Sequence, residues 1–143
     1  MTSTQITVRT GGRRGLYDLT AACERFVAEA SGEPDGRDAG DGLLSVFVPH
    51  ATAGIVVVEL GAGSDEDLVD ALDRLLPRDE RYHHRHGSPG HGADHLVTLL
   101  ASPSLTVPVI GGRLTLGAWQ SIALLDPNAD NETRSVRLSF LRA

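Results

Sequence analysis

The chain has 143 residues, enough to bury a hydrophobic core, and we expect residues 1–143 to form one domain. Its formal net charge of −6 argues against broad contact with a nucleic-acid backbone, and no apolar run approaches the ~20 residues that cross a membrane. A single cysteine, Cys23, excludes an intrachain disulfide. Because no signal peptide is visible either, the sequence predicts a cytoplasmic protein.

The N-terminal part is predicted to be a strand, a helix and a loop. Alternation of polar and apolar side chains over residues 5–10 is typical of a strand. Residues 19–30 carry apolar side chains at helical spacing, and Asp18 can cap that helix. Residues 31–42 are rich in Gly, Asp and Pro, which favours a loop.

The middle of the chain is predicted to hold two strands and two helices. The apolar residues 43–48 and 55–60 read as strands covered on both faces, and His50 lies in the link between them. A leucine stripe predicts a helix over residues 64–76. A shorter helix is expected over residues 92–101.

The C-terminal part is predicted to be β structure. Residues 105–109 and 113–116 flank a Gly-Gly turn, which is a hairpin signal. Residues 119–125 and 134–141 are expected to be a second strand pair. The predicted fold class is therefore α+β, an antiparallel β-sandwich with two or three helices.

Histidine is concentrated in one segment. Five of the six histidines lie between His83 and His95, and the sixth is His50. Imidazole is the commonest metal ligand among side chains and titrates near neutral pH. A loop rich in Gly, His and Pro can also be a solvated connection with incidental metal affinity, so density alone does not decide.

Three histidines that lie far apart in the chain suit a metal site. His50, His84 and His95 would leave a fourth coordination position open for water or substrate. Glu59 follows the strand after His50 and could be a ligand or a general base, or only a strand-end carboxylate in water.

The other histidines offer alternatives to this ligand set. His91 and His95 have i, i+4 spacing, so His91 competes with His84 as a ligand. His83 is expected to point away from the site, because neighbours in an extended segment face opposite sides. His86 is expected to be an exposed loop residue.

Several motifs resemble those of the YjbQ-like family of small uncharacterised proteins. Residues 50–59 resemble the family's His-Thr-Ser-Ala-x-x-x-x-Asn-Glu, and residues 82–84 its Tyr-x-His. Residues 93–96 resemble the Ala-His or Ser-His motif with which a helix of the family begins. Residues 103–109 resemble Pro-Ser-x-x-x-Pro-Val, and residues 112–120 resemble Gly-Arg-Leu-x-x-Gly-Thr-Trp-Gln. These motifs span nearly the whole chain in the family's order.

The resemblance implies a compact α+β fold built on a β-sandwich and assembled as a homotrimer. It also implies a metal or phosphate site at His50, His84 and His95, with a divalent ion such as zinc. Some family members carry the name secondary thiamine-phosphate synthase. The chain departs from the family pattern at Ala51 and Val58, which stand where the family has Thr and Asn.

Two functions from different classes follow. The first is a metal-dependent enzyme acting on a small phosphorylated substrate, with Glu59 as catalytic residue and Thr52, Trp119 and Gln120 in contact with substrate. Core packing of the Trp119 indole is an equal alternative. The second is a non-catalytic binding protein for a metal ion or an anionic metabolite. An open coordination position on the metal favours the enzyme, and a coordination shell filled by protein ligands favours the binding protein.

Overall fold

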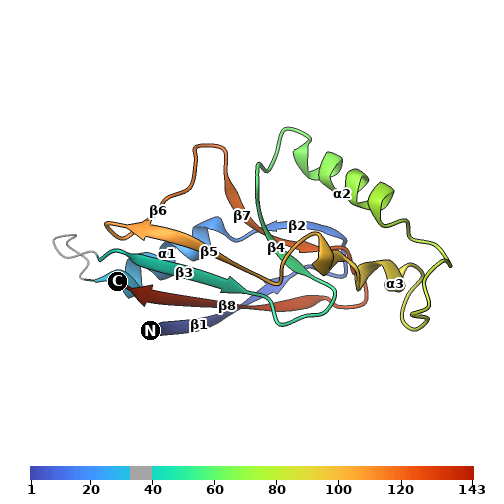
Figure 1. The fold of residues 1–143 in the computed structure, drawn as a ribbon, viewed down its shortest axis with the longest axis horizontal. Helices are drawn as coiled ribbons and strands as arrows, with labels where there is room; N and C mark the ends of the chain where they lie inside the picture. Colours follow the sequence, from blue (N-terminus) through green and yellow to red (C-terminus); the bar gives the residue numbers. More distant parts are fainter. Residues whose placement is uncertain (33–39) are drawn as a thin grey trace.

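The computed structural model describes residues 1–32 and 40–143, and Figure 1 shows antiparallel sheets with helices on one side and at one end. The first sheet has five described strands, in the spatial order β1 (Thr2–Arg9), β8 (Thr133–Arg142), β3 (Gly42–Phe47), β5 (Ser104–Ile110) and β6 (Arg113–Leu114). The second has three, in the order β2 (Gly15–Asp18), β7 (Ser121–Asp126) and β4 (Gly54–Val58).

The helices are α1 (Thr20–Ser31), α2 (Ser64–Leu75) and α3 (His91–Asp94), followed by a 3₁₀ turn over Val97–Leu99. The α+β class with antiparallel sheets and three α-helices is confirmed. None of the helices in the described ranges is long and apolar enough to cross a membrane. Of the loop predicted over residues 31–42, residues 33–39 lie outside the described part.

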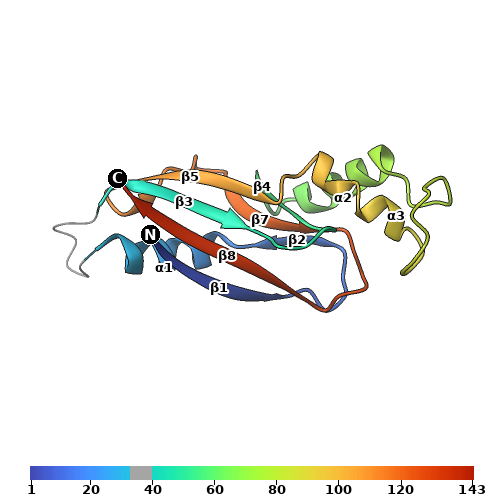
Figure 2. The same ribbon diagram turned by 60° about the horizontal axis from the view of Figure 1, so that its bottom comes forward.

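The main core lies between the two sheets and α1. Cys23, Phe26 and Val27 recur at helical spacing on one face of α1, and all three are buried there. The helix begins one residue later than predicted, so Leu19 rather than Asp18 is its N-cap residue. Asp18 Oδ1 accepts a hydrogen bond of 2.8 Å from Thr20 N, the first residue of the helix. Figure 2 shows α1 beneath the long strands of the first sheet.

β7 is buried on both of its faces. Leu124 packs into the main core, whereas Leu125 packs into a smaller cluster with Leu72 of α2 and with Val97. A strand covered on both sides needs no alternation, which is why this part of the sequence has none. The smaller cluster fixes α2 and the 3₁₀ turn against the second sheet.

Some predictions about pairing and helix length were wrong. The strands predicted over residues 119–125 and 134–141 do not pair with each other, because β7 pairs with β2 and β4 while β8 pairs with β1 and β3. The helix predicted over residues 92–101 is broken into α3 and the 3₁₀ turn. The short strand β2 was not predicted, because four residues give too little periodicity to recognise.

Candidate metal centre

Four imidazole rings converge at the end of the molecule where α3 lies. His84, His86, His91 and His95 each offer one nitrogen, and these four nitrogens all lie within 4.8 Å of one another. Nitrogens around a tetrahedral zinc ion lie roughly 3.3 Å apart for metal–nitrogen bonds of about 2.0–2.1 Å. His84 and His86, which are exposed, are the two side chains of the group with room to rotate toward that spacing. The cluster can therefore hold a metal ion.

α3 supplies two of the four rings. His91 begins this helix and His95 follows its last residue, so the i, i+4 spacing puts both on one side. Their Nε2 atoms are 3.0 Å apart, and only 11% of the His91 side chain is exposed. Two imidazole nitrogens at this distance either share one proton or face a common ion.

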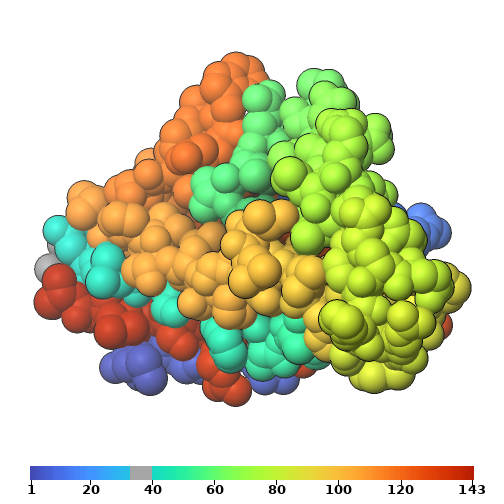
Figure 3. Space-filling model, turned by 45° about the vertical axis from the view of Figure 1, so that its right-hand side comes forward, coloured from blue at the N-terminus to red at the C-terminus, as the bar shows by residue number. Residues whose placement is uncertain are grey.

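The segment between α2 and α3 supplies the other two rings. Gly87 lies between the two histidine pairs and has a φ of +82°, a left-handed conformation that glycine adopts without strain. A Cβ on Gly87 would lie 2.6 Å from the His91 ring and 2.9 Å from Asp130 Oδ2. Glycine is needed here because the backbone passes directly against this pair. Figure 3 shows the yellow-green surface of the segment at one side of the molecule.

A carboxylate contacts Nδ1 of His91, the ring nitrogen that is not turned toward His95. Asp130 Oδ2 lies 2.7 Å from His91 Nδ1 and accepts a second hydrogen bond of 3.3 Å from Ser88 N. The side chain and N–H of Ser88 are the largest causes that lower the pKa of Asp130 to about 2, ahead of His91 and Asn128. Asp130 is therefore a carboxylate at neutral pH.

A buried ion pair anchors the polar residues behind the cluster. Arg134 donates through Nε and Nη2 to the two carboxylate oxygens of Asp126, at 2.7 and 2.8 Å, and both side chains are almost fully buried. Arg134 Nη2 also donates to Thr52 Oγ1 at 3.1 Å and contacts Asn128 Oδ1 at 3.4 Å. The guanidinium thus connects the loop after β3 with the loop after β7.

Asn128 continues this network to α3. Its side-chain amide donates to Asp94 Oδ2 at 2.9 Å, and Asn128 itself has no exposed surface. Asp94 is 1% exposed and forms an ion pair with Arg78. Asp94 directly precedes His95, so these contacts hold the histidine-bearing turn of α3 in place.

The pKa values of two cluster histidines are lowered. Loss of hydration is the largest cause for both His84 and His95, and the charges of neighbouring imidazoles in the cluster add to it. For His95, the carboxylate of Asp94 acts in the opposite direction. Both rings stay neutral to lower pH than an isolated imidazole, and the neutral ring is the form that binds a metal.

His50 does not lie in the four-histidine group of the described chain. Its Nε2 instead accepts a hydrogen bond of 3.0 Å from Ser135 N, next to the buried Arg134. The expected trio is thus brought together only in part: His84 and His95 meet, and His86 and His91 join them. His83 is exposed and does not belong to the four-histidine group.

The expected catalytic and substrate residues occupy other places. Glu59 follows β4 with an exposed side chain and is not part of the histidine group in the described chain. Thr52 is 6% exposed, and its hydroxyl is held by Arg134.

Trp119 and Gln120 lie in the loop between β6 and β7. In Figure 1 this loop projects at the top of the molecule, whereas α3 lies at the right-hand end. Trp119 is 77% exposed, so the indole is not packed into the core. Gln120 Oε1 accepts a hydrogen bond of 2.8 Å from Gly117 N, which closes the turn before β7.

Sequence reasoning missed the polar residues behind the cluster. Asn128, Asp130 and Arg134 stand in a stretch that reads as a polar turn and an exposed strand start. The i, i+4 spacing of His91 and His95 was the one local signal that pointed toward the observed group. No comparable spacing links Asp130 to His91, which is 39 residues away.

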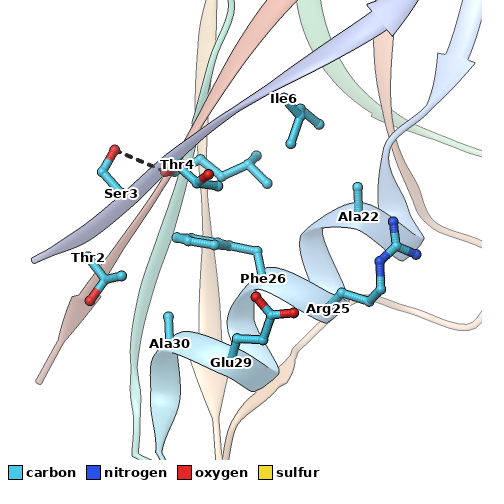
Figure 4. A pocket seen from close by; sticks show the side chains of 10 residues that line it. Thr2, Ser3, Thr4, Ile6, Ala22, Arg25, Phe26, Glu29 and Ala30 are labelled. Atoms are coloured by element: carbon cyan, nitrogen blue, oxygen red, sulfur yellow. Dashed lines mark hydrogen bonds between the residues drawn. The ribbon is translucent and has the colours of Figure 1, made fainter.

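Two cavities differ in the side chains that they offer to a ligand. One of about 220 Å³ opens beside the cluster and is lined by His84, His86 and His91 together with Tyr82 and Arg85. The other, of about 370 Å³, lies between β1 and α1, where Figure 4 shows the Phe26 ring pointing from the helix toward the strand. The residues that line the second cavity, all in the described part, include neither His nor Cys. Of these two cavities, the first is the one with imidazole side chains in its lining.

The chain was compared with known proteins. A sequence model of the UPF0047 protein YjbQ-like family matches residues 4–143. A UPF0047 protein of Mycobacterium tuberculosis is 59% identical over 129 residues, covering 90% of this chain and 90% of that protein. A UPF0047 protein of Archaeoglobus fulgidus is 33% identical over 123 residues, covering 85% and 88%.

Solved structures share the fold. The crystal structure of a hypothetical protein from Aeropyrum pernix has a TM-score of 0.86 and 30% sequence identity, with all of both chains covered. A YbjQ-like protein of unknown function from Sulfolobus solfataricus has a TM-score of 0.84 over 99% of this chain and 97% of its own, at 24% identity. The motifs, the family match over residues 4–143 and these relatives agree, and the chain belongs to the YjbQ-like UPF0047 family.

Proposed function

We propose that this protein binds a divalent transition-metal ion through His84, His86, His91 and His95. The observation that carries the proposal is the convergence of their four nitrogens within 4.8 Å. All four donors are imidazoles, a set that suits zinc, nickel, copper and iron better than magnesium or calcium. Zinc is the ion to test first.

Metal analysis of the untagged protein tests this proposal, since a histidine tag would itself bind the ion. We expect about one zinc ion per chain, with affinity measured by competition against a chromogenic chelator. His95→Ala should weaken binding by more than the roughly 10–100-fold typical of changes outside the ligand shell. His83→Ala removes an exposed imidazole outside the group and should leave affinity unchanged. Equal affinities of the two variants would contradict the proposal.

The cavity beside the cluster favours an enzyme over a closed binding site. Its volume of about 220 Å³ can admit a small phosphorylated molecule, and Arg85 at its wall is suited to hold a phosphate. The metal would polarise a phosphate oxygen or activate water. The proposed function is therefore a metal-dependent enzyme acting on a small phosphorylated substrate. The first reaction to assay is the coupling of a pyrimidine pyrophosphate to a thiazole phosphate.

The alternative is a binding protein for a metal ion or an anionic metabolite. Four imidazoles fill the shell of a tetrahedral ion, which supports this alternative for zinc, whereas a five- or six-coordinate ion keeps positions open for substrate. Co²⁺ substitution distinguishes the two. A visible spectrum that changes when inorganic phosphate is added supports an open position. A tetrahedral spectrum that phosphate leaves unchanged supports the binder.

Glu59 stays a proposed general base on its place in the motif of residues 50–59 alone, since it belongs neither to the histidine group nor to the lining of the cavity beside it. Glu59→Gln keeps the shape of the side chain and removes its charge. Turnover should fall by roughly 10²–10⁴-fold with the metal content unchanged. Full turnover in Glu59→Gln would leave Glu59 as a solvated strand-end carboxylate.

A further inference from the structure

His91 meets Asp130 on the side of its ring that faces away from the other histidines. Asp130 Oδ2 lies 2.7 Å from His91 Nδ1, while His91 Nε2 lies 3.0 Å from His95 Nε2. Asn128 Nδ2 also lies 3.0 Å from His91 Nδ1, so this nitrogen faces both a carboxylate acceptor and an amide donor. The carboxylate is the nearer partner and can only accept at neutral pH, which favours the tautomer of His91 with its proton on Nδ1. The lone pair on Nε2 is then directed into the cluster.

Asn128 keeps the carboxylate in that place. Its side-chain oxygen accepts a hydrogen bond of 3.0 Å from Asp130 N, and its amide donates to Asp94 Oδ2 at 2.9 Å. The same amide lies 3.4 Å from Asp130 Oδ2. Because Asn128 is fully buried, the position of Asp130 is set by the core rather than by the exposed loop.

We propose that Asp130 is a positioning residue for the metal centre: it fixes the His91 ring and its tautomer so that Nε2 is presented as a ligand. This inference rests on the proposed metal site, and it identifies the group that orients one of the proposed ligands. A carboxylate in this position also increases the basicity of the ligand nitrogen. Asp130 itself does not touch the ion.

Asp130→Ala removes the acceptor, and zinc titration of the whole chain should then show a 10–100-fold loss of affinity. Asp130→Asn retains an oxygen acceptor without the charge and should lose less. The matched control is Glu132→Ala, which also replaces a carboxylate side chain by a methyl group in the same loop, at an exposed position. Glu132→Ala should bind zinc like the unchanged protein.

The second measurement is the ¹⁵N NMR spectrum of the imidazoles in the metal-free protein. His91 should carry its proton on Nδ1, and Asp130→Ala should shift this tautomer toward Nε2. A purely structural role would not produce that shift. If Asp130→Ala does not fold, the zinc affinity of Asp130→Asn and the His91 tautomer of the unchanged protein test the role of Asp130.

The outcomes separate the two proposals. Absence of zinc binding by the unchanged protein overturns the proposed function. Normal binding by the unchanged protein, with equal affinities for Asp130→Ala and Glu132→Ala, overturns only the role of Asp130. A His91 proton found on Nε2 overturns that role whatever the metal measurement shows.

Discussion

At the scale of single residues, the polar side chains divide between the cluster and the core behind it. His50 and Thr52, which open the most recognisable motif, contact Ser135 and Arg134 near the start of β8 rather than the four imidazoles. These contacts indicate that His50 and Thr52 contribute to the stability of the folded chain. Arg134 and Asp126 form the buried pair on which this region depends.

Arg134→Met would leave the Asp126 carboxylate buried without its partner. An uncompensated buried charge costs about 3–5 kcal/mol of unfolding free energy. Denaturant unfolding followed by circular dichroism measures the loss. Arg137→Met, which changes an exposed arginine on the same strand, should cost within about 0.5 kcal/mol. A loss in Arg134→Met no larger than in Arg137→Met would contradict the importance of the pair.

His50 should make stability depend on pH. Burial is the largest cause that lowers the pKa of His50, and the charge of Arg134 acts in the same direction. The folded state then binds fewer protons than the unfolded state, so stability falls as pH drops from the unfolded value of about 6.5 through the lowered folded pKa. His50→Gln can still accept from Ser135 N but does not titrate. We expect a flatter pH profile of the unfolding midpoint.

The control for His50→Gln is His83→Gln, which removes an exposed histidine from the same chain. His83→Gln should keep the pH profile of the unchanged protein. Identical profiles for both variants would assign the pH dependence to other groups.

At the scale of elements, α3 is short, and contacts with neighbouring segments fix its position. Only four residues form it, too few for a stable isolated helix. Arg78 and Asn128 hold Asp94 from two sides, and Ala93 is buried. The two ligand candidates on α3 thus depend on packing by the segment before it and the loop after β7.

Gly92 is where α3 meets the chain that carries His84. A Cβ at Gly92 would lie 2.8 Å from Tyr82 Cβ and 3.0 Å from the carbonyl oxygen of His84. Gly92→Ala should therefore push these segments apart and weaken zinc binding by about 10–100-fold, the range for changes outside the ligand shell. Gly117→Ala, whose nearest neighbour would be at 3.4 Å, is the matched control and should bind normally. Unchanged affinity in Gly92→Ala would show that the segments adjust freely.

At the scale of the whole molecule, edges and apolar side chains remain uncovered in the single chain. β1 and β6 end the first sheet, and β2 and β4 end the second, among the described strands. Trp119 and Leu99 are 77% and 78% exposed. Such edges are usually covered or protected in native proteins.

We predict a homotrimer, on the resemblance stated above and on these uncovered edges. Light scattering coupled to size-exclusion chromatography at micromolar concentration should give about three times the chain mass of 15.2 kDa. Covering apolar surface favours association, so Trp119→Ser should reduce the trimer fraction if that loop lies in the interface. A mass of 15.2 kDa for the unchanged protein would contradict the prediction.

The sequence by itself determined the family, the α+β class and the segment in which the histidines gather. Local information was sufficient, because helical periodicity over α1 and α2, turn residues and the density of histidine are all properties of neighbouring positions. It did not determine which strands pair. β7 and β8 are joined by a short turn region yet belong to different sheets. The reason is that β7 packs against a hydrophobic cluster on each of its faces.

Only the tertiary structure decided which histidines meet. His84 and His95 were expected together with His50, but His50 bonds to Ser135 while His86 and His91 complete the group. The physical reason is that the direction of each ring depends on contacts far away in the chain. Asp130 lies in the loop after β7 and contacts His91, and no local sequence pattern predicts a contact between residues so far apart in the chain.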